Sequence, residues 1–229
     1  MACAQTYGER FFTLSQDLLC VMDRPGKLVA TNPAWQTMLG WSAEALAGMS
    51  YPDLTHPDDL AATEVVHAQG IAGTGVTDHL ARCRCQDGAY LWILWAASVD
   101  PTTGLTFVTG RDVTKRQEDA MRLARLVSII NDSDDAILSK DLNLKITTWN
   151  HGAERVYGYT EEEMLGRSVS VLIPHDRDGE GGTILGWVVA GEAIDHFETE
   201  RLRKDGTTVQ VSLSASGIRD LDGQVIGAS

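Results

Sequence analysis

The sequence lacks long apolar runs and has little basic charge. No stretch approaches the roughly 18 apolar residues that a membrane-spanning helix needs. Residues 1–10 lack the basic start and apolar stretch of a secretory signal. Acidic residues outnumber basic ones by 32 to 19, which gives a net charge of −13. Nucleic acids and anionic membranes require clustered Lys and Arg, so the charge argues against both as partners, and we expect a cytoplasmic protein.

Cysteine is also scarce, and its four residues all lie in the first half: Cys3, Cys20, Cys83 and Cys85. The last two are too close for an easy disulfide and do not have the spacing of a zinc ribbon. We expect reduced thiols that act as small hydrophobic residues. The histidines show no ligand spacing either, so no metal site is expected.

An internal repeat sets the organisation of the chain. Seven residues recur at an offset of 118: Asp23, Asn32, Gly40, Glu44, Gly48, Asp87 and Gly88 return as Asp141, Asn150, Gly158, Glu162, Gly166, Asp205 and Gly206. This period is far longer than the roughly 20–50 residues of a solenoid repeat, so it indicates duplicated domains. We expect a first domain at 8–111, a linking helix at 112–131 and a second domain at 132–229.

Each copy shows the same order of elements. A β-hairpin is predicted at 18–22 and 28–30, and again at 136–138 and 146–149. Asn32 and Asn150 are good helix N-caps, and the glycines at 40 and 158 suit helix ends. A longer helix follows at 58–69 and at 181–190. The last strands are predicted at 90–95 and 105–110, and at 197–203 and 208–215.

Two stretches carry unpartnered apolar residues. Residues 90–95 are apolar on both faces, so a helix, a dimer partner or the other domain must cover the outer face. Between the copies, Val113, Ala120, Met121, Ala124, Val127 and Ile130 recur at three- and four-residue steps. This spacing predicts an amphipathic helix that could serve as a coiled-coil dimer seam.

Several segments together resemble the PAS family of sensory domains: NPAWQTMLGWSAEALAG, HPDDL, RCQDGAYLWILWAAS, LRKDGTTVQVSLSAS and GRDVTKRQ. The resemblance implies an α+β fold with two PAS folds, each a five-stranded antiparallel sheet with short helices on one face. It also implies that Asp112, Val113 and Thr114 pass a signal into the following helix. The position matching Asp112 would be 230, so the second domain is expected to stop before its exit helix, ahead of an output domain such as a histidine kinase or nucleotide cyclase.

PAS domains bind flavins, haem or small metabolites, or nothing. The light-sensing flavin branch carries a reactive cysteine where this chain has Tyr51 and Val169, so no photochemical adduct is expected. Haem is less favoured, because Thr63 and Gly181 stand where the iron-ligating histidine would be, with His67 one turn further along. The resemblance favours FAD or FMN, held non-covalently in the first domain. The pocket candidates are His79, Cys83, Ile93, Trp95, Asn32, Trp35 and His67, although Trp95 could simply fill the core.

The second domain reads as an ordinary packed core. The resemblance places five of its residues inward: Phe197, Thr199, Arg201, Val211 and Leu213. Among them Arg201 is unusual as a polar residue that faces inward, and it could hold an anionic ligand.

The leading interpretation is a sensory input region of a signal-transduction protein that binds a small ligand or redox cofactor. The alternative is a ligand-free dimerisation and protein-interaction domain, with Trp92 on the outer sheet face as part of the contact. A homodimer is expected in either case. No catalytic activity is expected, because the sequence has no Gly-rich phosphate loop, nucleophile elbow or kinase signature.

Overall fold

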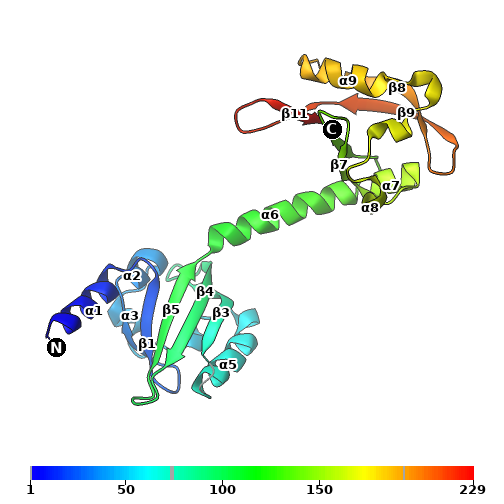
Figure 1. Ribbon diagram of the computed structural model, residues 1–229. Helices are drawn as coiled ribbons and strands as arrows, with labels where there is room; N and C mark the ends of the chain where they lie inside the picture. The colour runs from blue at the N-terminus through cyan, green and yellow to red at the C-terminus, as the bar shows by residue number, and fades with distance from the viewer. Residues whose placement is uncertain (1, 73–74, 193) are drawn as a thin grey trace. The chain divides into compact units, whose positions relative to one another are not determined.

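The computed structural model describes residues 2–72, 75–192 and 194–229, and among these the side chains of residues 2–6 are left out of the description. Cys3, expected to be a reduced thiol, is one of them. Contacts divide the chain into two compact units, 1–121 and 122–229 (Figure 1), and the division falls inside one helix. The domain boundaries expected from the sequence stay a prediction.

In the described part of the first unit, five strands form one antiparallel sheet in the order β2-β1-β5-β4-β3. The strands are β1 (Leu18–Met22), β2 (Leu28–Thr31), β3 (Val76–Arg84), β4 (Tyr90–Val99) and β5 (Thr106–Asp112). The helices are α1 (Ala2–Leu14), α2 (Ala34–Leu39), α3 (Ala43–Leu46), α4 (Tyr51–Leu54) and α5 (Pro57–Ile71). Strands β1, β2, β4 and β5 overlap the ranges expected for them, whereas no range had been expected for β3.

Local chemistry explains the first hairpin and the helix ends. Gly26 closes the β1–β2 turn with φ +91°, a conformation that favours glycine. Gly40 ends α2 in the left-handed region, as the sequence indicated. Asn32 does not cap α2, however: Pro33 occupies that position, and the Asn32 side chain accepts a hydrogen bond from the Leu19 amide instead. The N-cap prediction for Asn32 is therefore wrong.

The core of the first unit lies between the sheet and helices α2 to α5. Its buried members include Leu18, Trp35, Leu39, Leu46 and Ile93. Burying side chains of this size contributes about 1.5–3 kcal/mol each, which is the main term holding the short helices on the sheet.

Helix α6 (Thr114–Asn131) joins the two units. The expected helix is confirmed, and none of its residues is buried. Its exposed apolar side chains include Met121, Leu123, Leu126, Val127 and Ile129. Over the described ranges no helix is both long and apolar enough to span a membrane.

The second unit repeats the arrangement with one difference. Its strands are β6 (Leu138–Asp141), β7 (Ile146–Trp149), β8 (Ile194–Leu202), β9 (Thr208–Ala215), β10 (Gly217–Arg219) and β11 (Val225–Ala228). Its helices are α7 (His151–Tyr157), α8 (Glu161–Met164), η1 (Val169–Leu172), η2 (His175–Arg177) and α9 (Glu180–Val189). The first strand begins at Leu138, so the prediction of 136–138 was two residues early.

The strands of the second unit form two sheets, β10-β11-β6-β7 and β8-β9. Ser216 separates β9 from β10, and its backbone exchanges hydrogen bonds with Ser229. Strand β10 thus continues β9 after a break, which preserves the strand order of the first unit. The α+β class with two PAS-like layouts is confirmed, but the β8-β9 hairpin leaves the sheet, so the second sheet is not one five-stranded layer.

Candidate ligand-binding sites

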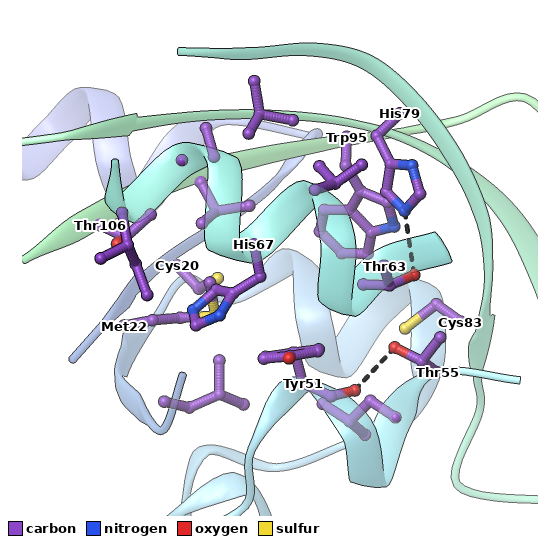
Figure 2. A pocket seen from close by; sticks show the side chains of 18 of the residues that line it. Cys20, Met22, Tyr51, Thr55, Thr63, His67, His79, Cys83, Trp95 and Thr106 are labelled. Atoms are coloured by element: carbon purple, nitrogen blue, oxygen red, sulfur yellow. Dashed lines mark hydrogen bonds between the residues drawn. The ribbon is translucent and has the colours of Figure 1, made fainter. Parts of the chain in front are cut away.

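A cavity of about 90 Å³ lies in the first unit between helix α5 and the sheet. Figure 2 shows side chains from α4, α5 and the strands converging on it. Five of the predicted pocket residues line it: Trp35, His67, His79, Cys83 and Trp95. Most other lining residues are apolar, so the cavity favours an apolar ligand that carries few polar groups.

His79 and Thr63 form a polar pair on one wall of the cavity. The Thr63 hydroxyl lies 3.0 Å from His79 Nε2 and donates to the Asp59 carbonyl oxygen at 2.9 Å. A hydroxyl has one proton, so Thr63 Oγ1 accepts from His79, and His79 carries its proton on Nε2. Burial lowers the pKa of His79, with the Asp59 charge acting in the opposite direction, which favours this neutral form.

His67 supplies a polar atom that has no protein partner. Its Nε2 is buried and makes no hydrogen bond within the described residues. The His67 ring lies 4.6 Å from the ring of Tyr51, and burial lowers the pKa of His67. A Cβ on Gly26 would lie 2.6 Å from the Tyr51 ring, so this glycine leaves the space that Tyr51 occupies. The unpaired Nε2 is available to a ligand in the cavity.

The cysteines at the cavity are unreactive. Burial raises the pKa of Cys20 and of Cys83 to about 12, so both are neutral thiols at physiological pH. The thiolate is the reactive form, and Cys83 therefore contributes apolar surface, as the sequence indicated for the cysteines.

Trp95 forms the wall nearest β5. Its ring lies 6.1 Å from that of Trp35, at an interplanar angle of 33°. Gly110 is its partner on β5, and a Cβ there would collide with the Trp95 ring. Trp95 lines the cavity and also packs against the core. The residue therefore fits both the prediction of a pocket residue and the alternative of a core residue.

The size of the cavity limits its occupant. A cavity of roughly 150 Å³ accommodates benzene, and pockets for larger ligands measure roughly 300–1,000 Å³. At about 90 Å³, this cavity does not fit the three fused rings of a flavin, and it fits haem still less. Flavin binding stays a prediction that this geometry does not favour.

Two predicted pocket residues do not reach the cavity. Asn32 is buried with its amide group bonded to the backbone of Ser15, Asp17 and Leu19. Ile93 is fully buried, and its side chain lies beside Gly110, where an added Cβ would be 2.8 Å from it. Their side chains serve the core, and neither is among the lining residues; the sequence pattern gave the right face of the sheet but not how far along it the cavity extends.

The predicted relay residues attach to strand β4. Thr114 Oγ1 accepts a hydrogen bond from the Trp92 amide at 2.9 Å, and the Val113 amide donates to the Trp92 carbonyl oxygen at 2.9 Å. Asp112 Oδ1 accepts from the Thr114 amide at 2.8 Å. The start of α6 is therefore bonded to both backbone groups of Trp92.

The outer face of Trp92 is covered from within the domain. The Arg82 guanidinium lies 5.1 Å from the centroid of its ring, and Asp59 holds that guanidinium at 2.9 Å. A cation–π contact of this kind lets an aromatic ring remain half-buried on a sheet face. The Arg82 side chain thus covers part of the Trp92 ring, which the sequence did not indicate. The role of Trp92 in an interface stays a prediction.

A groove of about 920 Å³ opens in the second unit, beside the β8-β9 hairpin. Of the predicted ligand residues, Arg201, Val211 and Leu213 line it. Phe197 instead packs against Trp187 at 6.2 Å, and Thr199 is buried in a hydrogen-bond network. The expectation of an ordinary packed core is wrong, because the hairpin leaves the main sheet and uncovers this space.

Arg201 is paired inside the domain. Its Nη2 lies 2.7 Å from Glu180 Oε1, and its Nη1 donates to Thr199 Oγ1 at 3.1 Å. Lys140 also lines the groove and is buried, so Arg201 is not the only inward charge. Lys140 was not among the predicted residues, because the first strand was expected to end at Leu138.

The repeat itself could have identified Lys140. The offset of 118 matches Lys140 with Met22 and Arg201 with Cys83, two residues that line the first cavity. Charged residues of the second domain at positions where the first domain has apolar cavity residues can be recognised from the sequence alone. Among the described residues, no group of three or more His, Cys, Asp or Glu is arranged to hold a metal ion.

Comparisons with known proteins agree with this layout. One family model of the PAS fold matches residues 124–229, and a second, also of the PAS fold, matches residues 28–107. Together they cover more than half of the chain.

Several solved structures are similar to one or both units. A domain of a sensory box sensor histidine kinase/response regulator from Geobacter sulfurreducens is 19% identical, with a TM-score of 0.44, over 49% of this chain and 97% of its own. A PAS domain from Colwellia psychrerythraea is 28% identical, with a TM-score of 0.43, over 46% and 90%. An RNA-binding light-oxygen-voltage receptor is 13% identical, with a TM-score of 0.38, over 93% and 92%. Because these scores are below 0.5, the assignment rests on the two family models.

Proposed function

Since the chain belongs to the PAS family, with two PAS domains in tandem, we propose that it is a sensory module whose first domain binds a small ligand and relays its presence through α6. It acts by binding and not by catalysis. The observation that carries the proposal is the bonding of Trp92 to Thr114, because Trp92 stands three residues before Trp95 on the same strand.

The path from ligand to helix is short. Trp95 lines the cavity, and its neighbours on β4 carry any displacement toward Trp92. Both backbone groups of Trp92 hold the start of α6. A ligand that shifts Trp95 would change the strength of these bonds, and it acts as a signal only if it binds the two states unequally.

The ligand class follows from the cavity. Its size suits a single small ring, its walls are mainly apolar, and His67 Nε2 requires one hydrogen-bond partner. A small ring that carries both an N–H donor and a ring nitrogen acceptor can pair with Nε2 in either tautomer of His67 and meets these conditions. Pyrazole is a suitable probe, and thiophene is a matched ring without the donor.

Two measurements on the full chain test the proposal. The indole N–H signal of Trp95 reports ligand binding by NMR, with Trp187 in the second unit, which does not line the cavity, as the reference. Hydrogen exchange of the first turn of α6 reports the relay. We expect pyrazole to shift the Trp95 signal more than thiophene does, and to change exchange at the start of α6.

Thr114→Val separates the two steps, because it removes the oxygen that accepts from Trp92 and keeps the shape of the side chain. This variant should bind pyrazole as the wild type does and show no change in α6. An unchanged Trp95 signal with both rings would reject the cavity as a ligand site. A shifted signal with unchanged α6 exchange in the wild type would reject the relay.

A second candidate function is dimerisation without a ligand, which the exposed apolar residues of α6 favour. A pair of such helices would cover Leu123, Leu126 and Val127, and coiled-coil pairing is one way to do so. Sedimentation of the full chain and of Leu126→Glu tests it. Monomeric wild-type protein at all concentrations would exclude this function.

A further inference from the structure

The groove of the second domain brings a second set of basic groups together. Lys140 on β6 and Arg201 on β8 both line it, at 8% and 4% exposure, and Tyr157 at the end of α7 lines it beside them. The first domain has Met22 and Cys83 at the positions that match the two cations, so the two domains present different chemistry.

The hydrogen bonds of the two cations are unequal. Arg201 bonds to Glu180, Thr199 and the Glu200 carbonyl oxygen. Lys140 makes no side-chain hydrogen bond and no ion pair with any described residue, although the residue is only 8% exposed. Its Nζ is not among the fully buried side-chain atoms that lack a partner, so the ammonium reaches the groove, where an anion can approach it.

The buried charges near the groove leave an excess of positive charge. Glu180 neutralises Arg201, and Lys140 remains. Arg177 also approaches Glu180, with 3.8 Å between Nη1 and Oε2, and Arg203 lines the groove as well. The acidic lining residues Asp134, Asp135 and Asp195 are exposed, so solvent and salt screen their charges.

The rest of the lining suits an apolar body. It includes Val169, Leu172, Ile173, Ile184, Val209 and Ala228. A ligand with one negative charge and an aliphatic part would place its charge at Lys140 and its chain along these residues.

We propose that the second domain binds a small organic monocarboxylate in this groove, with its carboxylate on Lys140. The site lies in another domain from the cavity beneath α5 and uses other residues, so it stands whether or not that cavity takes a ligand. Burial and the nearby Arg201 lower the pKa of Lys140, and a bound anion would oppose that shift.

The test uses hexanoate as the probe and hexanol as its uncharged counterpart, with binding to the full chain measured by calorimetry. Lys140→Met places in the second domain the residue that the first domain has at the matching position. Lys145→Met removes an exposed lysine from the same hairpin and is the control. Hydrogen exchange of the second domain confirms that each variant is folded.

We expect saturable binding of hexanoate to the wild type and to Lys145→Met, and binding at least about tenfold weaker to Lys140→Met, since a charge-assisted hydrogen bond is lost. Hexanol should bind at least about tenfold more weakly than hexanoate to the wild type. Equal binding of hexanoate to folded Lys140→Met, or no saturable binding to the wild type, would overturn the proposal. Tighter binding of inorganic phosphate than of hexanoate would overturn the choice of a carboxylate with an apolar body.

Discussion

The side-chain amide of Asn150 donates a hydrogen bond to the carbonyl oxygen of Ile130, 2.8 Å away in the last turn of α6. The same amide donates to the Asp135 carbonyl oxygen, and its oxygen accepts from the amides of Ile137 and Ala153. One buried side chain thus bonds the end of α6, the segment leading to β6 and the first turn of α7. Asn150 therefore connects the end of α6 to the second domain.

Asn150→Ala should destabilise the second domain by about 3 kcal/mol, because four hydrogen bonds are lost and buried backbone groups are left unpaired. Denaturant titration of the full chain, followed by hydrogen exchange in residues 138–157, measures the change. Asn143→Ala is the control, since Asn143 is exposed and its side chain makes no hydrogen bond among the described residues. A loss as small as that of the control would show that Asn150 does not hold these segments together.

Two tryptophans on opposite faces of β4 should respond differently to truncation. Trp95→Ala should cost about 3 kcal/mol, because it removes a ring from the core and enlarges the cavity. Trp92→Ala should mainly weaken self-association, because Trp92 lies on the outer face. Chemical denaturation and sedimentation of both variants separate the effects. If Trp92→Ala associates as the wild type does, the outer face is not an interface.

Much of the first domain could be predicted from sequence, because local signals fix it. Strand β1 lies where its apolar run predicted it, and Gly40 ends α2 as expected. Five of the seven predicted pocket residues line the cavity. Alternation along β3 and β4 accounts for three of them, His79, Cys83 and Trp95, because it decides which side chains face inward. Asn32 and Ile93 do not line the cavity, because tertiary packing decides how far the cavity extends and no periodic pattern encodes that.

The groove of the second domain could not be predicted in the same way. It exists because β9 breaks from the sheet at Ser216, and nothing in the alternation of residues 208–215 signals that break. Lys140 was detectable through the repeat, whereas its lack of a partner depends on tertiary packing. Thr199 and Phe197 face inward as expected, yet a network around Glu180 and contact with Trp187 occupy them.

Two helical glycines of the second domain should respond with opposite signs to the same substitution. A Cβ at Gly186 in α9 would meet nothing within 4 Å, so Gly186→Ala should stabilise by about 0.5–1 kcal/mol through helix propensity. A Cβ at Gly152 in α7 would collide with the Asp135 carbonyl oxygen, which is backbone and cannot move away alone. Gly152→Ala should therefore destabilise. Thermal unfolding of both variants decides the matter, and a shift of the same sign in both would contradict this packing at Gly152.

The first domain should lose stability in mild acid because of its two cavity histidines. Burial lowers the pKa of His67 and of His79 below the ordinary value of 6.5. The folded domain then resists protonation, and the unfolded chain binds more protons as the pH falls through this range. The contribution of these neutral histidines is complete above about pH 6.5 and is lost below it.

Thermal unfolding of the full chain between about pH 8 and about pH 5.5 measures this effect, with hydrogen exchange assigning it to the first domain. A double variant, His67→Gln with His79→Gln, keeps polar side chains of similar size and removes both titrating groups. We expect its stability to vary less with pH over this range than that of the wild type. The pKa of Asp59 is lowered from its ordinary value of 3.8, mainly by Arg82, so its titration lies below the range. An equal acid sensitivity in the double variant would place the titrating groups elsewhere in the chain.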